Sequence, residues 1–219
     1  MPVTDRSSSN LTLYQRYQYE KGGLGRLYWD YRDNIALSFL DKEDRCIVDL
    51  GCGEGITLEK IVKRFPDSEV VGLDTLEENI SICERYNLPV QKGDAYNIDF
   101  PENSIDAIVL MEVIEHLEKP GLAVDEIHRV LKPGGKLVLA YPNDVFFKIA
   151  RMVTLRFKEA GYDAGHVKQW TPREIECFLE EKGFVVVLTK CLPFLFWPVS
   201  LHGVTYAIKY GCETKTLDA

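Results

Sequence analysis

The sequence has no cysteine pair with C-x-x-C spacing, although it contains six cysteines. Zinc ribbons and thioredoxin-like redox sites depend on that spacing and are therefore excluded, as is a small scaffold held together by disulfides. We expect reduced thiols in a cytoplasmic protein.

Positive charge is also scarce, since 26 Lys and Arg stand against 34 Asp and Glu, for a formal net charge of −8. This balance disfavours general binding to phosphate backbones and argues against nucleic acid as a partner. Basic residues gather only between Lys148 and Lys168, where they could guide an anionic acceptor.

Long apolar runs are absent as well. The most apolar late stretch, Cys191 to Tyr210, is interrupted by two prolines, His202 and Lys209, so no membrane span is expected. Residues 1–10 are polar and lack the apolar core of a signal peptide, so we expect a flexible tail. With 219 residues, 46% of them hydrophobic, the chain is long enough for one globular domain. Nothing in the sequence indicates an oligomeric state.

What the sequence does contain, from Cys46 onward, is an alternation of strand-like and helix-like segments. Such alternation is typical of a doubly wound α/β fold, in which helices cover both faces of a parallel sheet. The last two strands follow each other without a long helix, which predicts a C-terminal antiparallel hairpin on a mostly parallel, seven-stranded sheet. The expected strands are Cys46–Leu50, Val70–Leu73, Pro89–Lys92, Ile105–Met111, Leu137–Ala140, Phe184–Lys190 and Val204–Tyr210.

Two local patterns predict where helices begin and break. Thr75 with Glu78, and Thr171 with Glu174, have the spacing of a capping box, which predicts a helix start at each threonine. Residues 11–40 read as an aromatic-rich helical segment that breaks near Gly22 to Gly25. We expect this segment to form a cap over the mouth of the ligand site.

The most informative segment is Ile47 to Gly55, an apolar strand that contains Asp49 and opens into a turn with glycines at 51, 53 and 55. Glycines followed by a helix let backbone amides approach a nucleotide-type ligand. The spacing is not the dinucleotide-binding G-x-G-x-x-G, and an acid at the mouth suits a cation better than a pyrophosphate. S-adenosylmethionine carries a sulfonium and an ammonium but no phosphate, and is such a ligand.

Two more carboxylates are expected at the same edge, because ligands of open parallel sheets bind at the carboxyl ends of the strands. Asp74 follows the second expected strand, where it can accept the protons of both ribose hydroxyls. Asp94, in the triplet Gly93-Asp94-Ala95, follows the third strand and can accept the adenine amino proton.

Together these segments resemble the motifs of class I S-adenosylmethionine-dependent methyltransferases over roughly residues 46–143, with a pattern closest to ubiquinone-biosynthesis O-methyltransferases. The matching stretches are Val48 to Gly53, Leu73-Asp74, Gly93 to Ala95, Asp106 to Val109 and Leu131 to Gly135. The resemblance implies a Rossmann-like methyltransferase fold and S-adenosylhomocysteine as the product. It assigns the cofactor to Asp49, Gly51, Cys52, Gly53, Asp74, Thr75, Asp94, Ala95 and Met111.

The segment after the fourth expected strand resembles the Glu-x-x-Glu-His segment of ubiquinone-pathway O-methyltransferases and small-RNA 2′-O-methyltransferases, which faces the acceptor. Helical spacing predicts that Glu112, Glu115 and His116 share one face. His166, which precedes the capped helix at Thr171 as in the quinone-pathway pattern, is expected to return to the same mouth.

Three interpretations of this cluster stay open. His116 could be the base that takes a proton from a hydroxyl acceptor, with Glu115 beside it. Glu112, Glu115, His116 and His166 could instead hold a divalent metal. Alternatively, these residues only pack. His128 and His202 have no such neighbours in the sequence and are expected to be structural.

We thus expect a tail at 1–10, a helical cap at 11–40 and a methyltransferase domain at 41–219. Residues 143–168 combine an apolar helical face with basic side chains, so they are either a lid insertion that meets an acceptor at a membrane surface or part of the core. The expected function is S-adenosylmethionine-dependent methyl transfer to a hydroxyl of a small-molecule or lipid-linked acceptor, with peripheral membrane contact. The alternatives are an RNA 2′-O-methyltransferase, a non-catalytic S-adenosylmethionine-binding protein and a nicotinamide-dependent oxidoreductase.

Overall fold

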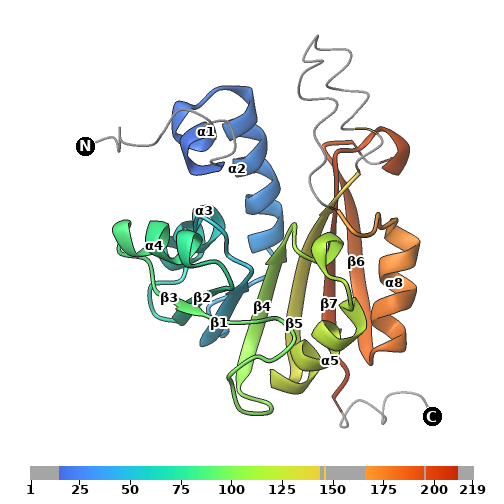
Figure 1. Cartoon of the computed structure of the whole chain (residues 1–219). Helices are drawn as coiled ribbons and strands as arrows, with labels where there is room; N and C mark the ends of the chain where they lie inside the picture. Colours follow the sequence, from blue (N-terminus) through green and yellow to red (C-terminus); the bar gives the residue numbers. More distant parts are fainter. Residues whose placement is uncertain (1–14, 144–145, 147–165, 195, 212–219) are drawn as a thin grey trace, which may run out of the picture.

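The structure is a computed structural model that describes residues 15–143, 146, 166–194 and 196–211 (Figure 1). The expected tail at 1–10 and nearly all of the expected lid insertion at 143–168 lie outside these described residues.

Seven strands form one sheet in the order β3-β2-β1-β4-β5-β7-β6. Strands β1 to β5 pair in parallel, and β7 runs antiparallel to both of its neighbours, β5 and β6. The predicted mostly parallel sheet with a C-terminal antiparallel hairpin is therefore confirmed. The strands are β1 (Cys46–Leu50), β2 (Glu69–Asp74), β3 (Val90–Lys92), β4 (Ile105–Met111), β5 (Leu131–Pro142), β6 (Phe184–Leu192) and β7 (His202–Lys209).

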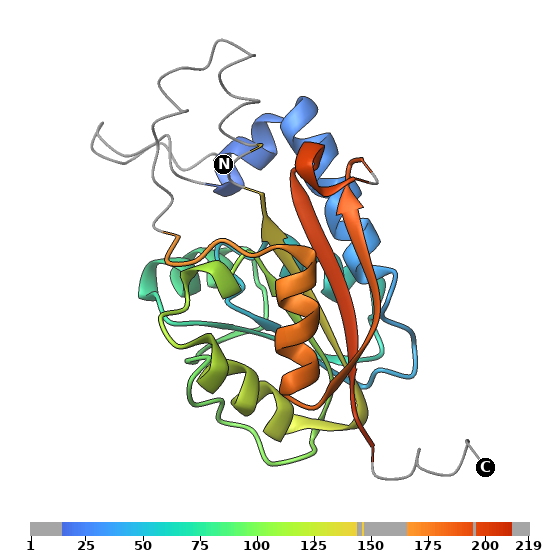
Figure 2. The same ribbon diagram turned by 90° about the vertical axis from the view of Figure 1, so that its right-hand side faces the viewer.

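Helices cover both faces of this sheet. The α-helices are α1 (Gln15–Lys21), α2 (Leu24–Leu37), α3 (Ile56–Arg64), α4 (Glu77–Arg85), α5 (Pro120–Val130) and α8 (Pro172–Glu181), and the 3-10 helices are η2 (Ile114–His116) and η3 (Trp197–Val199). Figure 2 shows α5 and α8 on one face, with α2 on the other. The break between α1 and α2 falls at Gly22 and Gly23, both with positive φ, as the sequence predicts.

The core alternates between the two faces with the period of a strand. Along β4, Ala107 and Val109 pack with α2 and α3, whereas Ile108 and Leu110 pack with α5 and α8. Successive side chains of a strand point to opposite faces, so a strand buried on both sides reads as a continuous apolar run. Among the described residues, no helix is long and apolar enough to cross a membrane.

The strand order indicates which edge of the sheet can bind a ligand. From β1 the chain moves outward through β2 to β3 and then returns to the other side of β1 as β4. The strand order therefore reverses between β1 and β4, which is where an open α/β sheet leaves a crevice at the carboxyl ends of its strands.

One of the two predicted capping boxes is present. The Thr171 hydroxyl accepts the Glu174 amide proton while the Glu174 carboxylate accepts that of Thr171, so α8 begins as predicted. The prediction at Thr75 is wrong, because α4 begins at Glu77 with Leu76 as its N-cap and no capping side chain there. Asp74 takes the capping role from outside the helix, since its Oδ1 accepts the Leu76 amide proton at 2.9 Å.

We expect Thr171→Ala to lower the free energy of unfolding by about 1 kcal/mol, because the substitution leaves helix N–H groups without their acceptor. For a domain of this size the melting temperature should fall by about 2–4 °C. Thr75→Ala is the matched control and should melt like the wild-type protein, both measured by calorimetry without ligand. Equal losses in the two variants would contradict the assignment of the caps.

Candidate active site

The glycine turn after β1 is held by the end of β2. The Gly51 and Cys52 amides both donate to the Leu73 carbonyl, at 2.7 and 3.0 Å, and the Gly53 amide donates to Asp74 Oδ2 at 2.8 Å. Gly51 has φ +73°, and a Cβ there would lie 2.5 Å from Val113 Cγ2, so only glycine fits. The expectation that turn amides reach the ligand is not met for these three. Because these amides already donate hydrogen bonds within the protein, they are not available to a phosphate, and the turn suits a ligand without one.

Asp49 supplies buried negative charge at this turn. It is 1% exposed, lines the adjoining cavity, and its Oδ2 has no hydrogen-bond partner. Burial raises the pKa of the Asp49 carboxyl well above its usual range, and the nearby carboxylates of Asp33 and Asp74 add to that rise. A buried carboxyl oxygen without a partner is costly, and a cationic ligand in the cavity would compensate it. The site therefore fits the sulfonium and ammonium of the expected cofactor.

Asp74 lies at the end of β2 with both oxygens partly used. Oδ2 holds the glycine turn, while Oδ1 accepts from the Leu76 amide and from Asn79 Nδ2, at 2.9 and 3.1 Å. Each carboxylate oxygen can accept more than one hydrogen bond. Because Asp74 also lines the cavity, its free lone pairs are available to ligand hydroxyls.

The cavity has a volume of about 630 Å³. This is large enough for a nucleoside-sized ligand and leaves room beside it. Every cofactor residue expected from the sequence lines it, namely Asp49, Gly51, Cys52, Gly53, Asp74, Thr75, Asp94, Ala95 and Met111.

The helical segment at the N-terminus adds walls to this cavity. Gln15 of α1, together with Trp29 and Arg32 of α2, lines it. The first turn of α1 sits on the glycine turn, because the Glu54 carboxylate accepts the Gln15 and Arg16 amide protons. Figure 1 shows these two helices together at one end of the molecule.

Glu112 does not join the cluster that the sequence predicts. It directly follows β4 with φ +57°, which ends the strand, and only the short 3-10 helix η2 follows. The expected helical face is therefore wrong. The Glu112 carboxylate turns instead to the Arg32 guanidinium and to His202 Nε2, the latter at 2.8 Å. A non-glycine residue in the left-handed region is strained and is held there by surrounding contacts.

Glu115, His116 and His166 do come together. One ligand atom from each lies within 4.8 Å of the others, and the two imidazole rings meet edge to face with centroids 4.8 Å apart. The segment that carries His166 is positioned by the Val167 amide, which donates to the Glu115 carbonyl at 2.8 Å. Glu115 is buried, His166 is half-buried, and His116 is exposed toward the cavity that it lines.

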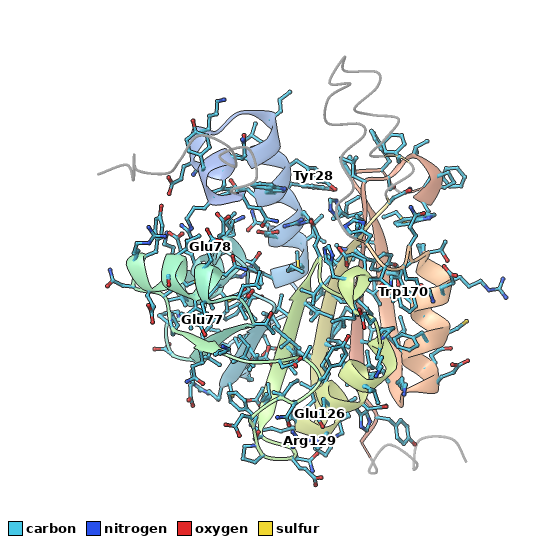
Figure 3. The ribbon with its side chains drawn as sticks, viewed as in Figure 1. Tyr28, Glu77, Glu78, Glu126, Arg129 and Trp170 are labelled. Atoms are coloured by element: carbon cyan, nitrogen blue, oxygen red, sulfur yellow. The ribbon has the colours of Figure 1, made fainter. Side chains whose placement is uncertain are left out.

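Sequence reasoning missed a second group of residues, which contacts Glu112 of the cavity wall. His202, expected to be only structural, is 1% exposed and joins Glu112 to the Tyr28 hydroxyl, with 2.7 Å between His202 Nδ1 and that oxygen. Figure 3 shows Tyr28 on α2, on the side toward the β6 and β7 end of the sheet. Tyr28 and His202 are 174 positions apart, and no local pattern in the sequence links them.

Two curated relatives illustrate what the chain is similar to. A probable S-adenosylmethionine-dependent methyltransferase of Mycolicibacterium smegmatis is 29% identical over 163 residues, which cover 73% of this chain and 60% of the relative. A mitochondrial ubiquinone biosynthesis O-methyltransferase of Dictyostelium discoideum is 31% identical over 169 residues, 68% of this chain and 52% of the relative. The chain thus spans about half the length of these relatives.

The fold has close structural counterparts. A crystal structure of a SAM-dependent methyltransferase from Archaeoglobus fulgidus superposes with a TM-score of 0.67 at 19% identity, covering 90% of this chain and all of the other. The methyltransferase domain family matches residues 25–189, which include β1 to β5, the glycine turn and the Glu115–His116–His166 cluster. The chain therefore belongs to the S-adenosylmethionine-dependent methyltransferase domains, and S-adenosylmethionine is its cofactor.

Proposed function

We propose that this protein transfers the methyl group of S-adenosylmethionine to a hydroxyl oxygen of a small-molecule or lipid-linked acceptor. The observation that carries the proposal is the convergence of Glu115, His116 and His166 beside the cavity that holds the cofactor residues. The ubiquinone O-methyltransferase similarity, together with the shared Glu-x-x-Glu-His segment, supports a hydroxyl as the nucleophile.

The cofactor would lie along the carboxyl ends of the strands. In this arrangement Asp74 accepts from the ribose, Asp94 and Ala95 border the adenine, and Asp49 offsets positive charge on the methionine part. Arg32, a cation on the same wall, suits the methionine carboxylate.

Methyl transfer requires little covalent chemistry from the protein. When bound, S-adenosylmethionine would supply an activated methyl group for in-line transfer to the acceptor oxygen, with S-adenosylhomocysteine as the leaving group, and the hydroxyl proton would have to leave. In this proposal His116 takes that proton, and Glu115 and His166 orient and stabilise the imidazolium.

The same three side chains suit a divalent metal. Two imidazoles and one carboxylate form a donor set typical of zinc and related metals, so Glu115, His116 and His166 would hold it and Glu112 would not. Such a metal would supply Lewis acidity that lowers the pKa of the acceptor hydroxyl.

An acceptor with an apolar portion is supported by the surface beside the site. Leu24, Leu27 and Tyr31 are exposed along one face of α2, and Phe194 and Phe196 are exposed near η3. Tyr28, on the same α2 face, contacts His202 at the start of β7, which places the two groups of apolar side chains near one another. Exposed apolar patches commonly mark ligand or membrane contacts.

We expect Asp49→Asn to weaken S-adenosylmethionine binding by about tenfold or more, because the cation loses its counter-charge. Binding of the cation favours ionised Asp49, whose pKa is raised in the free protein, so binding should release protons and tighten as the pH rises through that pKa. Calorimetry in two buffers of different ionisation enthalpy measures both effects. The exposed Asp99→Asn is the control, and unchanged affinity and proton release in Asp49→Asn would contradict this role.

Chelation distinguishes a mechanism with a histidine base from one with a bound metal. Turnover of 3,4-dihydroxybenzoate, a simple catechol, should fall with EDTA and recover with zinc or magnesium if a metal takes part. If His116 acts alone as a base, EDTA should have no effect, and His116→Ala should lose about 100-fold or more of kcat. His128→Ala is the control. Full activity of both His116→Ala and Glu115→Ala would leave the cluster as packing, and binding without turnover on any acceptor would favour a non-catalytic protein.

Acceptor class can be tested at the apolar side chains. A catechol that carries a polyprenyl chain should have a lower KM than the bare catechol, and Phe196→Ser should raise the KM of the prenylated compound only. The exposed Val185→Ser on β6 is the control. Equal KM values for the two compounds would argue for a small polar acceptor, and turnover of RNA instead would overturn the proposal.

A further inference from the structure

Two thiols meet at the glycine turn, and cofactor binding does not explain them. Cys52 lies inside the turn and lines the cavity, and Cys83 comes from α4 with no exposed surface. Both sulfurs point at the same oxygen, the Gly53 carbonyl, at 3.9 Å for Cys52 and 3.4 Å for Cys83. The two thiols therefore share one neighbour, the Gly53 carbonyl oxygen.

The buried, positively charged side chain of Arg16 lies next to these two cysteines. The Arg16 side chain is about 95% buried; its Nε donates to the Glu54 carbonyl and its Nη1 to Glu59, both at 2.9 Å, while Nη2 is buried with no acceptor. A Cβ at Gly55 would lie 2.8 Å from Cys83 Sγ and 3.5 Å from Arg16 Nη2, so sulfur and nitrogen border the same small space.

This arrangement stabilises a thiolate on Cys83. The hydrogen bond from Cys52 lowers the pKa of the Cys83 thiol, and the positive charge of Arg16 lowers it further, although burial opposes both. The same hydrogen bond and burial raise the pKa of Cys52. Cys83 is therefore the more readily ionised of the two thiols, and Cys52 is the one that lines the cavity.

We propose that Cys52 and Cys83 form a reversible disulfide across the glycine turn when a peroxide enters the empty cavity, and that this bond closes the cofactor site. Both sulfurs lie within 3.9 Å of the Gly53 carbonyl oxygen, and a disulfide requires them to approach each other to about 2.05 Å. Gly51 and Gly53 flank Cys52 and have the backbone freedom to absorb that movement.

The chemistry balances with hydrogen peroxide as the oxidant. The Cys52 sulfur attacks a peroxide oxygen, the O–O bond breaks, and Cys52 becomes a sulfenic acid while the leaving hydroxide takes up the Cys52 proton as water. The Cys83 sulfur then attacks the Cys52 sulfur and expels a second hydroxide, which takes up the Cys83 proton as water. Two electrons pass from the sulfurs to the peroxide, and a small thiol restores both cysteines by exchange.

Closure of the bond disturbs the cofactor site through the turn. Gly53 donates its amide to Asp74, and Cys52 forms part of the cavity wall, so drawing Cys52 toward α4 displaces both. Bound cofactor covers the same wall and should protect the pair. The inference concerns the cofactor end of the cavity and is independent of the acceptor.

The experiment uses reduced protein treated with hydrogen peroxide, with and without S-adenosylhomocysteine. Peptide mapping after alkylation should find a Cys52–Cys83 link with a loss of about 2 Da. Affinity for S-adenosylhomocysteine should fall by at least about tenfold and return after dithiothreitol. Prior binding of S-adenosylhomocysteine should slow the reaction.

Variants distinguish oxidation of the Cys52–Cys83 pair from general oxidation of the protein. Cys83→Ser and Cys83→Ala should bind S-adenosylhomocysteine before peroxide and keep that affinity after it, and Arg16→Lys should form the disulfide faster than Arg16→Met. Cys177→Ser, at an exposed position on α8, is the control and should behave as wild type. The proposal is overturned if no Cys52–Cys83 link forms, if the link leaves affinity unchanged, or if the Cys83 variants lose affinity as the wild type does.

Discussion

The attachment of the glycine turn to the end of β2 is the interaction on which the rest of the site depends. The Leu73 carbonyl takes two amide protons from the turn, and the Asp74 carboxylate takes a third while it also caps the approach to α4. Adjacent parallel strands thus lock the turn and the Asp74 carboxylate into one unit. A change in either element displaces the other, because charge-assisted hydrogen bonds between them are directional.

Charged side chains attach the N-terminal helices α1 and α2 to the glycine turn and the elements around it. Glu54, within the glycine segment, accepts the first amides of α1, and Arg16 returns its side chain to the Glu54 carbonyl. From α2, Arg32 reaches Glu112 after β4, and Lys60 of α3 reaches Asp33. Ion pairs of this kind, largely buried, are sensitive to the loss of one partner, so the N-terminal helices and the glycine turn are energetically coupled.

The positions of Glu115 and His116 depend on how β4 ends. A residue in left-handed conformation at Glu112 stops the strand and sends the chain into a single 3-10 turn. That turn carries Glu115 and His116 toward His166, while Glu112 is drawn to Arg32 and His202 on the other side. Glu112 and the Glu115–His116–His166 cluster therefore have different partners, although Glu112 and His116 both line the cavity.

The sequence by itself determined the mostly parallel sheet with its antiparallel C-terminal hairpin, the glycine turn, and the carboxylates near the ends of the first three strands, because these features depend on local periodicity and on residues whose conformational limits are strong. Tertiary structure decided the partners of Glu112, the use of Asp74 rather than Thr75 at α4, and the meetings of Tyr28 with His202 and of Cys52 with Cys83. Each of these joins residues that are distant in the chain or conformations that no local pattern predicts. They arise only when packing of the sheet and its helices brings separate elements within hydrogen-bonding distance.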